Sequence, residues 1–461
     1  MPIYTVQCGK EIILGDIALD VVNDLFSAPG LNYKFKRCLG TESDHSGIIA
    51  IADAESTFRA PANDLVNEVN AVLPTGGPIL AVSNIPKQIY LGSGPAGGRK
   101  VFWEFGHDNL PNRHLLIFGA SGTGKTYTVQ ALMAELSKNK ANSLIVDYSN
   151  GFTTNQLESV IIDKLAPQQH IIRSEPLPIN PFRKQSIFVD GIPIEDTSVQ
   201  IAQRVSGVFS QVYTLGEQQK AVLYNAIKDG IETHAANFNL AQLVALLEDV
   251  INEGGMLANS AISLINKIGP FVDMNPFGQE SEHSWEKLYL DQNSKSHIIQ
   301  LAGFMKDSAR LITEFALIDL YWYYRGRGSK DEPRVIVLDE IQNLDHSLTS
   351  PLGQLLTEGR KFGISLILAT QTLSNLSKEE KDRLFQASHK LFFKPADTEV
   401  KTFAQLLADA THEKVETWVH QLSRLQRGEC YSLGNAYNPV SQRLEVNKVF
   451  KIKIDSLENR F

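Results

Sequence analysis

The residues best suited to chemistry lie in one glycine-rich stretch with the pattern G-x-x-x-x-G-K-[ST], the P-loop. Its members are Gly119, Ala120, Ser121, Gly122, Thr123, Gly124, Lys125 and Thr126. The glycines allow backbone conformations closed to residues with a Cβ atom, so successive N–H groups can converge on phosphate oxygens. Lys125 can reach the β- and γ-phosphates, and the Thr126 hydroxyl can complete the coordination of Mg²⁺. The stretch therefore predicts a nucleotide-binding site.

The flanking sequence supplies the context that this motif needs. Residues 114–118 form an apolar run of strand length, and the apolar residues after the motif recur with helical spacing. The alternative is a glycine turn between strand and helix that binds no ligand. A second glycine cluster, at 94–100, has no helical pattern after it, and we interpret it as a turn.

Two carboxylates end another apolar run further along the chain. Residues 335–338 are apolar, and Asp339 and Glu340 follow them. In this form, known as Walker B, Asp339 would hold Mg²⁺ through its water shell and Glu340 would polarise the attacking water. A plain surface pair is the alternative, but the position downstream of a P-loop favours the hydrolytic interpretation.

Two further side chains could act on the phosphates. Gln371 ends the apolar run 364–370, where it can hydrogen-bond a water molecule or the γ-phosphate and so sense the nucleotide state. Arg360 is the best candidate for an arginine finger, which acts across a subunit boundary on the transferring phosphoryl group. The alternative for Arg360 is a solvated position on a helix surface.

The elements that must position these residues alternate between strands and helices from residue 115 onward, as in a mostly parallel sheet covered on both faces. Asp147 ends the strand predicted at 143–147, where it could contact a water or the metal, or cap the following turn. Between about 190 and 269 three helical patterns follow one another and predict a helical insertion. The polar loop at 325–330 could face a phosphate backbone or water. The fold class is therefore α/β, with a P-loop core, a helical insertion and a small N-terminal domain.

Length and composition bound the remaining possibilities. The 461 residues, of which 43% are hydrophobic, suit two to three globular domains, and the formal net charge of -8 disfavours indiscriminate coating of nucleic acid. Cys8, Cys38 and Cys430 are widely separated, so we expect free thiols and no zinc site. No secretory signal and no apolar run of about 18 residues is visible, so we expect a cytoplasmic protein without a membrane partner.

The two ends of the chain carry no catalytic motif. Residues 1–98 predict a small mixed domain, with strands at 11–14 and 47–52 and a helix at 63–72, followed by a flexible junction at 92–98 and a strand at 101–105. Toward the other end we predict a helix at 399–407, a strand at 428–433 and an edge strand at 450–454. The tail at 441–461 could brace a neighbouring subunit or fold back on its own domain.

The order of the motifs resembles the HerA/FtsK superfamily of DNA-pumping ATPases, closest to its HerA branch, over about residues 100–440. The segments that carry the resemblance are 119–126, Ile179-Asn180-Pro181-Phe182, the helical insertion, Leu338-Asp339-Glu340, 358–363 and Ala369-Thr370-Gln371. It implies a RecA-like fold, a hexameric ring around double-stranded DNA, and translocation driven by ATP with Mg²⁺. By the same resemblance Gln371 would be the sensor, Arg360 would reach the neighbour's ATP, and Arg113 would be a further phosphate-contacting arginine.

Two functional hypotheses follow. The first is an ATP-driven double-stranded DNA translocase or helicase that works with a nuclease or another effector in DNA-end processing or antiphage defence. Bacterial antiphage systems that pair a HerA-like ATPase with such a subunit are included in the resemblance. The second is a scaffold ATPase, whose ring activates a partner effector without translocating DNA. The complete set of hydrolysis residues favours the first, and the acidic net charge keeps the second open.

Overall fold

The chain divides into two units, Met1–Asn84 and Ile85–Phe461. The computed structural model describes residues 4–7, 11–14, 85–95, 98–107, 109–139, 141, 143–189, 192–278, 285 and 296–461. In the first unit β1 (Tyr4–Gln7) pairs antiparallel with β2 (Glu11–Leu14), and β2 confirms the strand predicted at 11–14. The strand predicted at 47–52 and the helix predicted at 63–72 lie outside the described residues.

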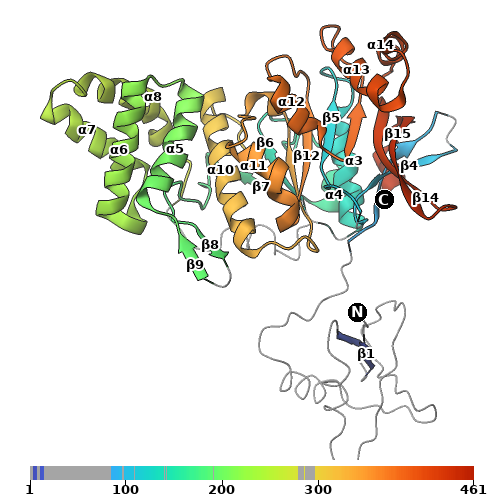
Figure 1. Ribbon diagram of the computed structural model, residues 1–461, viewed down its shortest axis with the longest axis horizontal. Helices are drawn as coiled ribbons and strands as arrows, with labels where there is room; N and C mark the ends of the chain where they lie inside the picture. The colour runs from blue at the N-terminus through green and yellow to red at the C-terminus, as the bar shows by residue number, and fades with distance from the viewer. Residues whose placement is uncertain are drawn as a thin grey trace, which may run out of the picture. The chain divides into compact units, whose positions relative to one another are not determined.

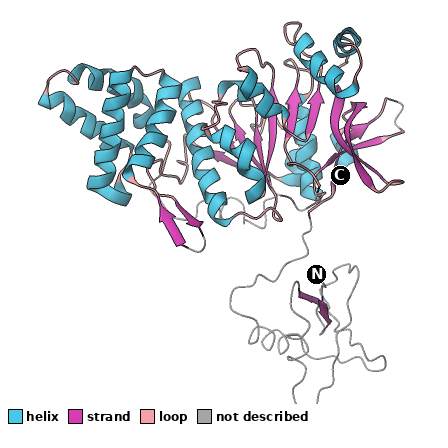
Figure 2. Ribbon diagram, in the orientation of Figure 1, coloured by secondary structure: helices cyan, strands magenta, loops and turns pink. Residues whose placement is uncertain are grey.

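The second unit is built on an 11-stranded sheet of order β4-β3-β15-β14-β13-β5-β12-β11-β6-β10-β7. Its strands from β13 to β7 pair in parallel (Figures 1 and 2). In sheet order these are β13 (His389–Phe392), β5 (Leu115–Phe118), β12 (Ile364–Thr370), β11 (Arg334–Leu338), β6 (Ser143–Asp147), β10 (Ser296–Gln300) and β7 (Gln168–Ile171). Because parallel strands share one direction, the segments after β5, β12, β11 and β6 meet at one edge of the sheet.

The central strands β5, β11 and β12 are largely apolar because both faces of the sheet are covered there. Along β5, Leu115 and Ile117 pack into one core with α3 (Lys125–Lys138) and α4 (Ser159–Leu165). Leu116 and Phe118 face the other core, which holds α10 (Lys306–Arg327) and α11 (Pro351–Glu358). The helices that follow are α12 (Lys378–Phe385), α13 (Val400–Thr411) and α14 (Val415–Ser423). Among the helices in the described residues, none is both long and apolar enough to span a membrane.

The helical insertion holds four helices, where the sequence predicted three. They are α5 (Ser198–Tyr213), α6 (Glu217–His234), which the 3-10 turn η1 (Ala235–Asn237) follows, α7 (Leu240–Glu253) and α8 (Ala258–Asp273). A hairpin of β8 (Ser186–Val189) and β9 (Ile192–Glu195) precedes them, and in Figure 1 the helices gather at one end of the unit. The prediction missed α8, which contains Pro270 and follows a pair of glycines, two signals that usually end a helix.

The other end of the sheet corrects several predictions. The sheet ends with β14 (Glu429–Asn438), β15 (Arg443–Lys453), β3 (Gln88–Ser93) and β4 (Lys100–Glu104). The edge-strand prediction was wrong, because β15 lies between β14 and β3. The segment expected to be a flexible junction contains the end of β3, which pairs with β4 in a hairpin, so the second unit begins before residue 98. Part of the polar loop expected at 325–330 is helical, because α10 continues to Arg327 and its last arginines lie over aromatic rings.

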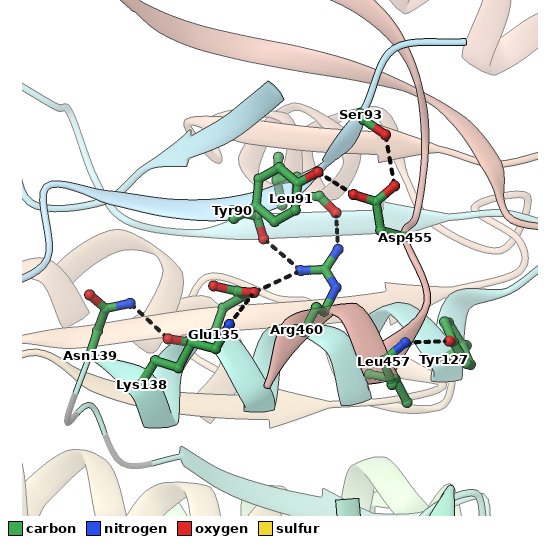
Figure 3. A network of polar contacts seen from close by, with 10 residues as sticks. All are labelled: Tyr90, Leu91, Ser93, Tyr127, Glu135, Lys138, Asn139, Asp455, Leu457 and Arg460. Atoms are coloured by element: carbon green, nitrogen blue, oxygen red, sulfur yellow. Dashed lines mark hydrogen bonds and ion pairs between the residues drawn. The ribbon is translucent and has the colours of Figure 1, made fainter. Parts of the chain in front are cut away.

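The tail folds back on its own unit through a buried ion pair (Figure 3). Arg460, in the 3-10 turn η4 (Leu457–Arg460), is 1% exposed, and its guanidinium lies 3.3 Å from Glu135 Oε1 of α3. The same guanidinium donates to the carbonyl oxygens of Tyr90 and Leu91 in β3, at 3.1 and 2.6 Å. Leu457 N donates to the Tyr127 hydroxyl at 2.9 Å. The end of the chain thus joins β3 to the helix that follows the P-loop.

Arg460 and Lys138 both pair with Glu135, and we predict that substituting them changes the free energy of unfolding by very different amounts. Arg460→Met should lower the free energy of unfolding by about 3 kcal/mol, because it leaves Glu135 and two carbonyl groups without a buried donor. Lys138→Met is the control, because Lys138 also pairs with Glu135 Oε1, at 3.5 Å, but its side chain is 43% exposed. It should cost less than about 1 kcal/mol. Denaturant unfolding of the full chain measures both changes. Equal losses of stability would contradict a stabilising role for the buried ion pair between Arg460 and Glu135.

Candidate nucleotide-binding site

The P-loop connects β5 to α3, as predicted, and close packing fixes its path. A Cβ atom added to Gly119 would lie 2.6 Å from Cβ of Phe393, so the first glycine leaves no room for a side chain. Gly122 and Gly124 have φ angles of 75° and 117°, which L-residues rarely adopt. Ala120 N donates to the Lys394 carbonyl at 2.9 Å. The residue types of the motif are therefore those that this backbone path requires.

The start of α3 is suited to an anion. Gly124 is its N-cap residue, no side chain in the described part of the chain caps it, and its first turn contains no acidic residue. The N–H groups at the start of a helix have no partner within the helix, and the helix dipole makes this end positive. A phosphate at this position would receive these hydrogen bonds, as at many other helix N-termini.

Lys125 is buried at this helix start, with 7% of its surface exposed. Its Nζ donates to the carbonyl oxygens of Gly119 and Ala120 at 2.8 and 3.0 Å, so the ammonium lies against the loop. Burial lowers its pKa, and the carboxylates of Asp339 and Glu340 act in the opposite direction. The structure thus brings together the predicted lysine and the two predicted carboxylates, although they are separated by more than 200 residues in the sequence.

Asp339 follows β11 and shares its surroundings with Thr126. Burial, followed by the charge of Glu340, raises the pKa of Asp339 to about 6. Its carboxylate accepts hydrogen bonds from Ser149 Oγ at 3.0 Å and from Glu340 N at 2.9 Å. A Cβ atom added to Gly151 would lie 3.5 Å from Thr126 Cγ2 and 3.9 Å from Asp339 Oδ2. These two side chains, which α3 and the end of β11 supply, therefore converge on one space.

This donor set fits the predicted Mg²⁺. Mg²⁺ in phosphate-transferring sites takes one or two carboxylates, a hydroxyl, substrate phosphates and waters, and needs no cage of protein ligands. Thr126 and Asp339 supply the hydroxyl and the carboxylate. Within the described residues no group of three or more histidine, cysteine, aspartate or glutamate side chains is placed to hold a metal, so a site closed by protein ligands alone is not formed there.

Glu340 is held by two amide side chains. Its carboxylate accepts a hydrogen bond from Gln371, which follows β12, and a second from Gln342 in the 3-10 turn η2 (Ile341–Asn343). Gln342 also accepts from the Thr370 hydroxyl at 2.7 Å, so it joins the ends of β11 and β12. Glu340 itself has a φ of 54°, which turns its side chain out of line with the strand. The sequence did not predict this role of Gln342, because it depends on how the ends of β11 and β12 meet.

Asp147 caps a turn, which was one of its two predicted roles. Its carboxylate is fully buried and accepts from Gly151 N at 3.0 Å, from Phe152 N at 2.9 Å and from Gln300 Nε2 at 2.8 Å. Burial raises its pKa, and these hydrogen bonds lower it. The turn that Asp147 holds carries Ser149, the donor to Asp339. Asp147 therefore positions Asp339, the carboxylate predicted to bind Mg²⁺, indirectly.

The two predicted arginines lie at the other edge of the sheet. Arg360, in the 3-10 turn η3 (Gly359–Phe362) before β12, is exposed and donates to the Pro111 carbonyl at 2.8 Å. Arg113 precedes β5 and donates to the carbonyl of Phe105 at 2.9 Å and to that of Lys330 at 2.7 Å. Because β5 spans about 13 Å at the usual rise per residue, neither arginine is beside the P-loop of its own chain. Their roles toward a nucleotide stay predictions that require a second copy of the chain.

The fold and the site define a RecA-like P-loop ATPase core. Residues 97–319 match the family model of the "Helicase HerA, central domain". The match confirms the resemblance to the HerA/FtsK superfamily that the order of the motifs indicated.

Curated relatives carry the same family name. The DNA double-strand break repair helicase HerA of Sulfurisphaera tokodaii is 23% identical over 339 residues, which cover 71% of this chain and 63% of the relative. The protein of the same name from Sulfolobus acidocaldarius is 24% identical over 373 residues, with coverages of 76% and 66%. The match thus spans less than two thirds of the length of either relative.

Solved structures share the fold at low sequence identity. VirB4 of Thermoanaerobacter pseudethanolicus superposes with a TM-score of 0.59 at 17% identity, over 81% of this chain and 97% of that one. The bacterial conjugative coupling protein TrwB superposes with a TM-score of 0.52 at 16% identity, over 80% and 89% of the two chains. These similarities confirm the predicted RecA-like fold.

The geometry around Glu340 predicts a separation of binding from hydrolysis. Glu340→Gln should bind ATP with unchanged affinity, because Lys125 and the loop amides remain, but should hydrolyse it about 100-fold more slowly, because the amide cannot accept a proton from water. Nucleotide titration and single-turnover hydrolysis measure the two properties. Glu332→Gln, an exposed position, is the control for the same change of charge. If Glu340→Gln lost both properties together, the carboxylate would be structural.

Proposed function

We propose that this protein hydrolyses ATP and uses the energy to translocate along, or unwind, double-stranded DNA. It would act as a ring of identical subunits, a hexamer as the resemblance to the HerA/FtsK superfamily implies. One observation carries the proposal. The residues to which we assign phosphate binding and hydrolysis meet at one edge of the sheet, whereas Arg360 lies exposed at the other. In a head-to-tail ring, one edge of each subunit faces the opposite edge of its neighbour.

Each residue has a distinct part in the hydrolysis. The P-loop amides and Lys125 bind the β- and γ-phosphates, and Thr126 and Asp339 would hold Mg²⁺, which neutralises phosphate charge. Glu340 orients the attacking water and accepts its proton. Gln371, which donates to Glu340, reports to β12 whether the γ-phosphate is present. Arg360 of an adjacent subunit stabilises the charge that develops on the transferring phosphoryl group.

Known proteins support this proposal from two directions. The curated relatives from Sulfurisphaera tokodaii and Sulfolobus acidocaldarius are named DNA double-strand break repair helicases. The plasmid coupling protein TrwB, which has the same fold, has been solved in complex with a non-hydrolysable ATP analogue, with a TM-score of 0.52 to this chain. Helicase activity and ATP binding are therefore the functions that the site residues favour here.

The partner of such a ring would be a nuclease or another effector, in DNA-end processing or in antiphage defence. The competing function is a scaffold ATPase whose ring activates that effector without moving along DNA. The formal net charge of -8 favours this second function, because a protein that tracks phosphates needs a basic surface at least in its channel. The two functions differ in their response to DNA.

Steady-state ATP hydrolysis with and without long linear double-stranded DNA distinguishes them. We expect DNA to stimulate hydrolysis severalfold, and this stimulation to weaken steeply as salt rises, because phosphate contacts release counterions. Lys125→Ala is the blank and should not hydrolyse ATP. Hydrolysis that is indifferent to DNA, or that begins only when an effector is added, would favour the scaffold. Turnover in Lys125→Ala equal to that of the natural chain would remove the P-loop from the mechanism.

Mixing of two inactive variants tests the arginine. Arg360→Ala should lose hydrolysis by about 1000-fold or more, the size of effect known for arginine fingers. Because its own P-loop is intact, a mixture with Lys125→Ala should recover part of the activity, since Lys125→Ala subunits supply Arg360 to the intact P-loops of their neighbours. Arg360→Ala mixed with a second copy lacking Arg360, such as Arg360→Gln, is the control and should stay inactive. Failure of the first mixture to recover would contradict a role across subunits.

A further inference from the structure

A cavity of about 560 Å³ lies between the helical insertion and the nucleotide-binding core, apart from the P-loop. Its walls are α5 of the insertion, α10, and the segment 345–354 that follows the hydrolytic carboxylates. The volume is in the range of small-molecule pockets and much larger than a single water site. Glutamine and hydroxyl side chains line much of it, together with Trp322, so the cavity is polar with an aromatic wall.

The polar group that defines this cavity is Glu314. Only 2% of this residue is exposed, although it lies on the cavity wall. Its Oε1 accepts a hydrogen bond from Asp345 N at 2.8 Å, and its Oε2 has no hydrogen-bond partner in the described part of the chain. Leaving a buried carboxyl oxygen without a partner costs free energy. A donor inside the cavity would remove that cost.

The charges around the cavity favour a cation. The carboxylate of Asp345 also lines it, and its charge adds to burial in raising the pKa of Glu314 to about 7. Arg204 is already engaged, because it pairs with Asp196 at 2.8 Å and lies over the Trp322 ring at 5.5 Å. Arg310 lies one turn before Glu314 and lowers its pKa, whereas the charge of Asp345 raises it. With Arg204 and Asp196 neutralising each other, two carboxyl groups remain on the wall.

We propose that this cavity binds a small organic cation with a guanidinium or ammonium group. Its N–H groups donate to Glu314 Oε2 and to the carboxylate of Asp345, and its carbon atoms lie against Trp322. A planar guanidinium suits the site because it offers several donors in one plane. A metal ion suits it less, since the described residues form no group of three or more metal-ligating side chains.

A cation bound in the cavity would influence the nucleotide site through a short segment of the chain. The cavity wall at Asp345 lies five residues after Glu340, and the Asp345 carboxylate accepts from Ser347 N at 2.9 Å and from Ser347 Oγ at 3.0 Å. A bound cation would order this segment from the insertion side. The site thus offers small molecules a route to influence hydrolysis, and binding itself can be measured without any nucleotide.

Calorimetric titration of the full chain with methylguanidinium tests the proposal. We expect one site per chain, and a loss of affinity of about tenfold or more in Glu314→Gln, which keeps the side-chain volume but removes the charge. Glu332→Gln, outside the cavity, should bind as the natural chain does. Methylurea has a similar shape without the charge and should not bind.

A second variant guards against a folding defect in Glu314→Gln. Gln211 is exposed on the cavity wall, so Gln211→Lys should fold, place an ammonium in the cavity and abolish methylguanidinium binding. Thermal unfolding of each variant checks that it is folded. Absence of binding to the natural chain would overturn the proposal. Equal affinity in Glu314→Gln and the natural chain, equal binding of methylurea, or undiminished binding by Gln211→Lys would overturn it as well.

Discussion

The packing of the P-loop against the end of β13 is the constraint on which the site depends. Gly119 lies so close to Phe393 that no side chain fits between them, and Ala120 N is tied to the carbonyl of Lys394. A third tie comes from Gly428 N, which donates to Thr123 O at 3.0 Å. A loop that must present N–H groups to phosphates gains from being rigid, because less ordering is left for the binding event. The parallel strand β13 and the segment before β14 supply that rigidity.

The same edge of the sheet collects charges that stabilise one another. Lys125 is buried near two carboxylates, and burial alone would drive Lys125 and Asp339 toward their neutral forms. Strand β12 lies between β5 and β11, so its end separates the lysine side of the site from the carboxylate side. Thr370 and Gln371 occupy that end, and both belong to the amide network around Glu340. A change at one of these groups would therefore alter the surroundings of the others.

The sequence predicted those parts of the site that depend on local pattern. The P-loop, Asp339 and Glu340 are each encoded within a few residues, because backbone freedom and a strand end require specific residue types there. Gln342 and the role of Asp147 depend on how strand ends meet, and no local pattern contains that. The tail was equally open, because the choice between a neighbour and its own unit rests on Arg460 meeting Glu135, more than 300 positions earlier. The prediction missed α8 because it contains Pro270, a residue that usually marks the end of a helix.

The tail also bears on how copies of the chain could assemble under the proposed function. In this structure the side chains of Leu457 and Arg460 are buried against α3 and β3, so these two are not available to reach another subunit. Contacts between subunits would then rest on the sheet edges themselves, with the exposed side of Arg360 facing a neighbouring P-loop. Among the residues that the structure describes, Arg360 is held by the Pro111 carbonyl alone, through an exposed hydrogen bond that costs little to break. A side chain held this weakly can turn from its own chain to a neighbour's phosphate when two copies meet.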